Sequence, residues 1–296
     1  MTAGAPRPPD PGGAPAPLDR APPTDWDDAY ANSAHVPEAP EIIARWERDA
    51  PAFRDALGPR ARSGLPYPGP LNDAERERFD LFLPEGEPKG LTVFIHGGYW
   101  MGYHPSLWSS LAAGPLARGW AVAMPSYTLA PAARIGDIVR QIAAFLDAAA
   151  QQVPGPIRLS GHSAGGHLAA RMVCGAAPEA LLPRIERTVS ISGVHDLRPI
   201  RRTALNDTLK IDAAEALAES PALLTPVEGA RVTAWTGAAE RPEFVRQAEL
   251  LANVWVGLGA ATRLVLDPGR NHFDVIDALA DPASPLVAEL CGDPGP

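Results

Sequence analysis

Short apolar runs of four or five residues recur along the chain from residue 79 onward. Their length is typical of strands that are buried on both faces of a sheet. The runs cover residues 79–83, 91–95, 120–124, 157–160, 188–192, 232–235 and 263–266. Longer stretches with apolar residues at helical spacing lie between them, at 135–152, 164–177, 242–257 and 272–279. Strands that alternate with helices predict an α/β fold with a mostly parallel central sheet flanked by helices.

Three segments depart from this alternation. Residues 26–57 have helical spacing in pieces, and Asp25 and Pro40 are suited to helix starts. Residues 58–70 are rich in Pro and Gly, which predicts a loop. Residues 200–228 follow neither period, so we expect a small cap region over one end of the sheet. We assign residues 24–296 to a single domain, since 296 residues suffice for one large α/β domain.

The amino-acid composition and net charge of the chain exclude some classes of binding partner. Hydrophobic residues make up 46% of the chain and charged residues 21%, an ordinary globular balance. The formal net charge is −9, and no block of Lys and Arg offsets it, so neither nucleic acid nor an anionic membrane is an expected partner. We expect a small-molecule substrate instead. A homodimer is compatible with the sequence, which does not determine the oligomeric state.

The two cysteines and the amino-terminal residues indicate the cellular compartment of the protein and whether it binds a metal or another cofactor. Cys174 and Cys291 belong to no Cys/His cluster, which predicts free thiols in a reducing, cytoplasmic setting and no metal or other cofactor. No apolar segment reaches the ~18 residues that a membrane span needs. Residues 1–23 are rich in Pro, Ala and Gly without an apolar core, so we expect a disordered tail rather than a secretion signal.

The segment Gly161-His162-Ser163-Ala164-Gly165 matches the motif G-x-S-x-G. A predicted strand precedes it and an apolar helical stretch follows, which is the context that a nucleophile elbow requires. The tight turn exposes the serine hydroxyl at the end of the sheet, and the glycines let strand and helix pass closely. Ser163 is therefore the candidate nucleophile.

The segment His96-Gly97-Gly98-Tyr99-Trp100 directly follows the predicted strand 91–95. Paired glycines at a strand end allow backbone N–H groups to turn into a cleft, where an oxyanion hole needs two donors. We assign these donors to the N–H of Gly98 or Tyr99 and to that of Ala164, which follows the nucleophile.

The base and the acid follow from chain order, which in this fold runs nucleophile, acid, histidine. Of the seven histidines, only His272 lies in a loop after the last strand and before a helix. Glu240 is the first carboxylate after the predicted strand 232–235, and it is our first choice for the acid that orients His272. Glu243, in the first turn of the next helix, and Asp267, in a Pro-Gly turn, remain alternatives.

With these residues in place, the chain resembles the kynurenine formamidase (arylformamidase) group of α/β hydrolases. Two motifs are specific to this branch, H-G-G-x-W at His96 and P-E-F-x-R-Q at Pro242. Four further blocks share the resemblance, namely Ser126-Tyr127-Thr128-Leu129-Ala130-Pro131, Gly161-His162-Ser163-Ala164-Gly165-Gly166-His167-Leu168, Ser192-Gly193-Val194-His195-Asp196-Leu197 and Asn271-His272-Phe273.

The resemblance implies hydrolysis of N-formyl-L-kynurenine to L-kynurenine and formate, with Ser163 as nucleophile and His272 as base. It places Glu240 where the family usually has Asp, and it gives the oxyanion donors as Gly98 and Tyr99. Two other functions stay open. One is a carboxylesterase of the same fold that acts on short acyl esters, and the other is a non-catalytic binding protein of this fold.

Overall fold

The computed structural model describes residues 22–292, so the expected disordered tail lies outside the described residues except for its last two positions. Eight strands form one sheet in the order β1-β2-β4-β3-β5-β6-β7-β8. Their bounds are β1 Ala61–Pro66, β2 Arg78–Phe82, β3 Leu91–Ile95, β4 Ala121–Pro125, β5 Ile157–His162, β6 Ile185–Ile191, β7 Arg231–Gly237 and β8 Ala261–Asp267. The pairs β1–β2 and β2–β4 are antiparallel, and all the other pairs are parallel.

Each of the seven predicted apolar runs overlaps one strand, from β2 to β8. The apolar runs are continuous because the central strands are covered on both faces, and all five residues of β3 and of β4 are buried. The prediction of an α/β fold with a mostly parallel sheet is therefore confirmed.

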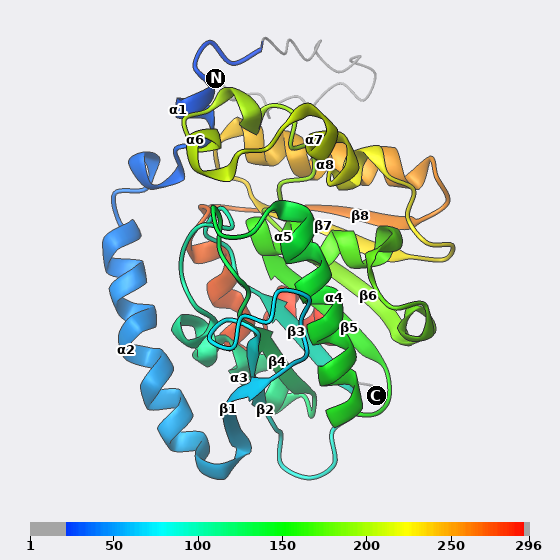
Figure 1. The fold of residues 1–296 in the computed structure, drawn as a ribbon. Coiled ribbons are helices and arrows are strands. Elements are labelled where there is room, and N and C mark those ends of the chain that lie inside the picture. Colours follow the sequence, from blue (N-terminus) through cyan, green and yellow to red (C-terminus); the bar gives the residue numbers. More distant parts are fainter. Residues whose placement is uncertain (1–21, 293–296) are drawn as a thin grey trace, which may run out of the picture.

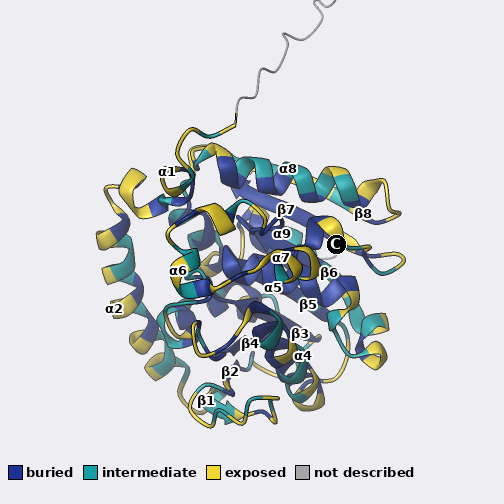
Figure 2. Ribbon diagram, turned by 45° about the horizontal axis from the view of Figure 1, so that its top comes forward, coloured by how far each residue is buried: buried dark blue, intermediate teal, exposed yellow. Residues whose placement is uncertain are grey.

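Helices cover both faces of this sheet (Figure 1). The α-helices are α1 Trp26–Tyr30, α2 Ala39–Leu57, α3 Ala113–Ala117, α4 Ile135–Gln152, α5 Ala164–Arg171, α6 Asn206–Leu209, α7 Ala213–Ala218, α8 Pro242–Val256 and α9 Pro285–Cys291. One apolar cluster joins α4, α5 and α8 to the sheet, and a second joins α2, α3 and α9 to it. Figure 2 shows the buried strands between these layers, with the outer helix faces exposed.

Shorter helical turns connect these elements. Between residues 22 and 292, seven of them are 3₁₀ turns and one, η4, is a π-helical turn. They are η1 Asn32–His35, η2 Gly58–Arg60, η3 Pro105–Ala112, η4 Met172–Ala176, η5 Glu179–Arg184, η6 Ile200–Arg202, η7 Pro221–Leu223 and η8 Asp274–Ala280.

The structure corrects three expectations. Residues 58–70 are not only a loop, because Ala61–Pro66 forms the edge strand β1. This strand lacks an apolar run because it pairs on one side only, with a register shift after Arg62, and is half exposed. The helix expected at 164–177 ends at Arg171 and continues as a π-helical turn. The helix expected at 272–279 is the 3₁₀ helix η8, and His272 lies in the loop before it.

The excursion at 200–228 contains η6, α6, α7 and η7, and it packs against α1, α5 and α8. One contact fastens it to α5, since the backbone carbonyl of Glu219 accepts a hydrogen bond of 2.7 Å from His167 Nε2. The Glu219 carboxylate also pairs with Arg171 at 2.9 Å. These contacts hold the excursion beside α5, the helix that follows Ser163.

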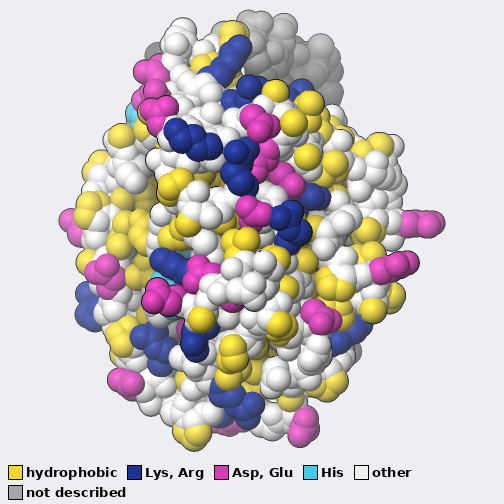
Figure 3. Space-filling model, viewed as in Figure 1, with side chains coloured by type: hydrophobic (Ala, Val, Ile, Leu, Met, Phe, Trp, Pro, Cys, Tyr) yellow, Lys and Arg dark blue, Asp and Glu magenta, His cyan; other side chains and the backbone are white. Residues whose placement is uncertain are grey.

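Two features of the described residues concern possible partners, namely the hydrophobicity of the helices and the distribution of charge on the surface. None of the helices in residues 22–292 is long and apolar enough to cross a membrane. On the face shown in Figure 3, acidic and basic side chains are interspersed with hydrophobic ones.

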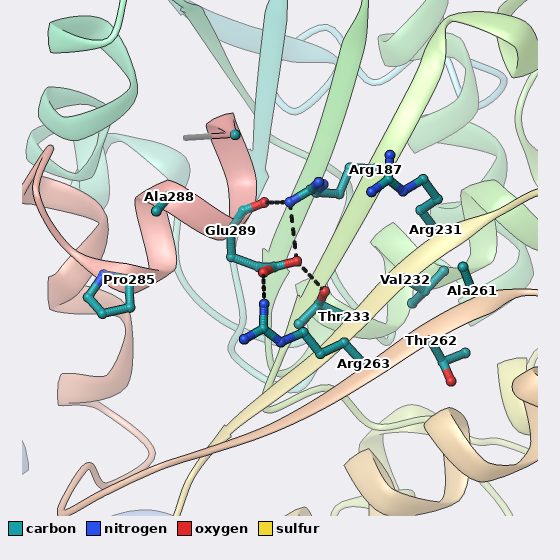
Figure 4. Close-up of a pocket in the computed structure, with 11 residues that line it drawn as sticks. Arg187, Arg231, Val232, Thr233, Ala261, Thr262, Arg263, Pro285, Ala288 and Glu289 are labelled. Atoms are coloured by element: carbon teal, nitrogen blue, oxygen red, sulfur yellow. Dashed lines mark hydrogen bonds and ion pairs between the residues drawn. The ribbon is translucent and has the colours of Figure 1, made fainter. Parts of the chain in front are cut away.

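A carboxylate near the amino ends of the strands fastens α9 to the sheet (Figure 4). Glu289 Oε1 accepts hydrogen bonds from Thr233 on β7 at 2.7 Å and from Arg187 on β6 at 3.3 Å. Its Oε2 accepts one from Arg263 on β8 at 2.7 Å. These groups line a hollow of about 530 Å³ with Arg231, and Glu289 already provides the negative charge between Arg187 and Arg263. The cluster therefore serves to hold α9 against three strands.

Replacing Glu289 by Ala is expected to lower the free energy of unfolding by about 2 kcal/mol, because the half-buried Arg187 loses its counter-charge. Urea unfolding measures the change. Glu85→Ala is the control, because Glu85 is 89% exposed and pairs only loosely with Arg60, at 3.6 Å. The control is expected to change stability by less than about 0.5 kcal/mol. Equal losses in the two variants would contradict the role assigned to Glu289.

Candidate active site

Ser163 occupies a strained turn between β5 and α5. Its backbone has φ 55° and ψ −117°, in a region that residues with a side chain rarely adopt. A hydrogen bond of 2.8 Å from the Ser163 N–H to the carbonyl of Ile191 ties this turn to the end of β6. The predicted elbow is thus present in the backbone, with Ser163 at the carboxyl end of β5.

The two glycines of the motif are required by close backbone approaches. A Cβ atom on Gly161 would lie 2.1 Å from the carbonyl oxygen of Gly165. A Cβ atom on Gly165 would lie 1.9 Å from the carbonyl oxygen of Ile95. Both separations are below any tolerable contact, so only glycine lets α5 start this close to β5 and β3.

The loop after β3 carries the expected oxyanion donors. Gly98, Tyr99 and Trp100 all have positive φ angles, of 105°, 49° and 56°. The N–H groups of Gly98 and Tyr99 have no acceptor among the described residues, and neither has that of Ala164, the first residue of α5. Three backbone donors are therefore free beside Ser163, in agreement with what an oxyanion hole requires.

The side chain of Tyr99 ties this loop to the amino-terminal segment. Its hydroxyl donates a hydrogen bond of 2.6 Å to the carbonyl of Tyr30, and it accepts one of 3.3 Å from Asn32 Nδ2. Residues 26–35 thereby help to hold the strained loop in place. The sequence did not indicate this contact, because it joins residues 69 positions apart.

His272 and Glu240 form a buried pair. His272 Nδ1 lies 2.6 Å from Glu240 Oε2, and the two side chains are 7% and 0% exposed. The other oxygen, Oε1, accepts hydrogen bonds from the Ser192 hydroxyl at 2.5 Å, the Gly237 N–H at 2.8 Å and the Thr236 hydroxyl at 3.1 Å. Four donors thus stabilise the carboxylate and fix its orientation toward the imidazole.

The other two carboxylates considered for this position have different partners. Glu243 accepts hydrogen bonds from the Tyr30 hydroxyl at 2.8 Å and from Arg246 at 2.7 Å. Asp267 accepts one of 3.2 Å from the indole N–H of Trp235. The structure therefore brings Glu240, rather than Glu243 or Asp267, to His272.

Neighbouring rings set the orientation of His272. Its ring centroid lies 4.4 Å from that of Phe244 and 4.7 Å from that of His162. Burial lowers the pKa of His162 well below its usual value, so His162 is neutral and its Nε2–H donates to the carbonyl of His272 at 2.8 Å. His162 thus supports the loop of His272, and Phe244 belongs to the P-E-F-x-R-Q block of the sequence.

A pocket of about 390 Å³ brings these groups together. Ser163, His272, Gly98 and Tyr99 all line it, although no hydrogen bond joins the Ser163 hydroxyl to His272 among the described residues. Aromatic side chains dominate its walls. The lining residues are Tyr30, Ala31, Asn32, Ser33, Ala34, Trp46, Gly97, Gly98, Tyr99, Tyr103, Trp108, His162, Ser163, Leu205, His272 and Phe273.

Sequence reasoning missed a large part of this wall. Residues 30–34 come from α1 and η1, far ahead of the motifs, and only Leu205 comes from the excursion that we expected to form a cap. The same holds for Ser192 and Thr236, which support Glu240. The position of Ser192 directly after β6 was a usable signal, because the carboxyl ends of parallel strands meet at one edge.

Comparison with known proteins agrees with this architecture. The family model of the alpha/beta hydrolase fold matches residues 92–272, from β3 through His272. The chain belongs to this family. Kynurenine formamidase of Danio rerio is 28% identical over 222 residues, which cover 72% of this chain and 76% of the relative. Kynurenine formamidase of Drosophila melanogaster is 28% identical over 226 residues, 69% of this chain and 74% of the relative.

Solved structures give the same picture. A crystal structure from Silicibacter sp. TM1040, described as a candidate thioesterase, is 48% identical with a TM-score of 0.86, and covers 90% of this chain and 99% of its own. An esterase of Pyrobaculum calidifontis has a TM-score of 0.63 at 19% identity, over 84% of this chain and 90% of its own, and shows the fold alone. The chain is a hydrolase of this fold. Within the family it is kynurenine formamidase-like, as its motifs indicated.

Acid is expected to destabilise the fold through four buried histidines. Burial lowers the pKa values of His96, His167 and His195 to about 3, and that of His162 well below the usual 6.5. Below pH 6.5 these histidines become protonated in the unfolded chain but remain neutral in the folded chain. The free energy of unfolding therefore falls as the pH drops toward 3. Each histidine contributes up to about 1.4 kcal/mol per pH unit.

Urea unfolding between pH 7 and pH 5 measures this loss, and ring NMR signals separate it from the titration of carboxylates. The rings of these four histidines are expected to remain neutral at pH 5. A titration of any of them above that pH would contradict the assignment.

Proposed function

We propose that this hydrolase cleaves aryl formamides by acyl transfer to Ser163, with N-formyl-L-kynurenine as the leading substrate. His272 acts as general base and acid, and Glu240 orients and stabilises its imidazolium. The observation that carries the proposal is the 2.6 Å pair of Glu240 and His272 in the same pocket as the strained Ser163. A binding protein without catalysis would need neither the pair nor the free donors beside it.

The reaction proceeds in two steps. His272 takes the proton of the Ser163 hydroxyl as the oxygen attacks the formyl carbon, and the N–H groups of Gly98, Tyr99 and Ala164 stabilise the oxyanion. His272 then protonates the departing aniline nitrogen, and the C–N bond breaks to leave a formyl ester on Ser163. Water, activated by His272, attacks this ester and releases formate.

The pocket and the relatives favour an aryl formamide. A formyl group needs almost no acyl pocket, whereas an aryl leaving group needs a long apolar wall. The aromatic side chains of Tyr30, Trp46, Tyr103, Trp108 and Phe273 provide such a wall. The relatives from fish and fly are named kynurenine formamidases, which supports the same chemistry.

A carboxylesterase is the second candidate. The same nucleophile, base and oxyanion donors act on esters without any change, and several solved structures with this fold are named esterases. Aryl formamides and p-nitrophenyl acetate, assayed side by side, distinguish the two functions by their kcat/KM values.

Two substitutions test the catalytic assignments. Ser163→Ala is expected to lower kcat/KM for N-formyl-L-kynurenine by at least about 10³-fold and to abolish labelling by a fluorophosphonate probe. Glu240→Gln is expected to lower kcat by about 10³–10⁴-fold, because the amide favours the wrong tautomer of His272. Release of kynurenine, followed by absorbance, measures both effects.

Asp267→Asn is the matched control, because an asparagine oxygen still accepts the hydrogen bond of Trp235. It is expected to change kcat by less than about threefold. Activity of Ser163→Ala within about tenfold of the parent, or equal losses in Glu240→Gln and Asp267→Asn, would rule out the mechanism.

A further inference from the structure

We propose that the pocket recognises only the uncharged acyl-aryl part of its substrate and leaves a charged headgroup in water. The inference rests on the proposed function and specifies its substrate class. Formylkynurenine carries an alanyl headgroup with one ammonium and one carboxylate, so it is one of many aryl formamides and aryl esters that this site accepts.

The composition of the pocket wall carries the proposal. Six of the lining side chains are aromatic, from Tyr30, Trp46, Tyr99, Tyr103, Trp108 and Phe273. None of the residues that line it is Asp, Glu, Lys or Arg. Its two histidines are already engaged, because His162 is neutral and donates to the His272 carbonyl, while His272 pairs with Glu240.

Three pairs of charged side chains lie next to the lining residues, and a further cation, Arg76, donates to the backbone carbonyl of Tyr103 at 2.9 Å. Arg246 is bound to Glu243 at 2.7 Å, beneath Tyr30. Arg45 is bound to Asp277 at 2.5 Å, and Asp277 also accepts the indole N–H of Trp46 at 2.9 Å. The third neighbouring pair is Arg241 with Asp28. A substrate carboxylate or ammonium would have to compete with these existing partners.

Apart from the groups assigned to catalysis, two buried side-chain polar atoms of the wall have no partner, and both are neutral. They are the side-chain oxygen of Asn32 and the indole N–H of Trp108, both buried. One is an acceptor and the other a donor, which suits a neutral N–H and a neutral carbonyl on the substrate. Neither group offsets the cost of taking a full charge out of water.

A headgroup attached to the aryl ring therefore stays at the mouth of the pocket. The exposed lining residues there are Ser33, Ala34 and Tyr103. None of these three side chains carries a charge, and the Arg76 guanidinium beside them is already bound to the carbonyl of Tyr103. The headgroup therefore contributes little to binding in either the ground state or the transition state. The value of kcat/KM is then set by the acyl and aryl parts alone.

Matched substrate pairs test this with the full chain. The first pair is N-formyl-L-kynurenine and 2-formamidoacetophenone, which keeps the aryl formamide and lacks the charged headgroup. The second pair is O-acetyl-L-tyrosine and 4-methylphenyl acetate, which presents the same contrast on an ester. Each kcat/KM is measured at about 0.02 M and about 0.5 M NaCl, and the rate of Ser163→Ala is subtracted.

The neutral member of each pair is expected to react within about threefold of the charged member or faster, with a ratio that salt does not change. A preference of more than about tenfold for the charged member, weakened by salt, would overturn the inference. If only the esters react, the formamide function fails and the ester pair alone decides the inference. If neither pair reacts, both the function and the inference are wrong.

Discussion

The carboxylate of Glu240 is the point at which the ends of three neighbouring strands meet. Ser192 follows β6, Thr236 and Gly237 end β7, and His272 follows β8, and all four residues donate to this one carboxylate. A buried carboxylate without such donors would be costly, so the four hydrogen bonds both stabilise it and fix its direction. The position of the imidazole, and with it the chemistry proposed for Ser163, depends on this arrangement.

The P-E-F-x-R-Q block acquires a physical meaning from the structure. Phe244 packs on the ring of His272, Glu243 binds the Tyr30 hydroxyl, and Gln247 accepts the N–H groups of His195 and Asp196. One turn of α8 thus connects the imidazole, the amino-terminal segment and the loop after β6. None of these side chains touches the place where a substrate reacts, so the block acts by positioning.

The amino-terminal segment completes the site from outside the sheet. Its residues 30–34 form part of the pocket wall, and the carbonyl of Tyr30 accepts the hydroxyl of Tyr99 from the oxyanion loop. A loop with three successive positive φ angles needs such support, because its own backbone conformation is unfavourable. The shape of the pocket, the geometry of the oxyanion loop and part of the uncharged wall therefore depend on this segment, which precedes every recognised motif in the sequence.

The sequence by itself determined the α/β fold class, the elbow at Ser163 and the loop position of His272, because these depend on local spacing: apolar runs of strand length, glycines at fixed offsets and chain order. It favoured Glu240 as the acid without excluding Glu243 and Asp267, and it missed the edge strand β1 and the pocket wall at residues 30–34. Only the tertiary structure decided these, since the contacts concerned join residues far apart in the chain. Which carboxylate pairs with His272 depends on the relative positions of the carboxyl ends of β7 and β8. No local sequence pattern indicates these relative positions.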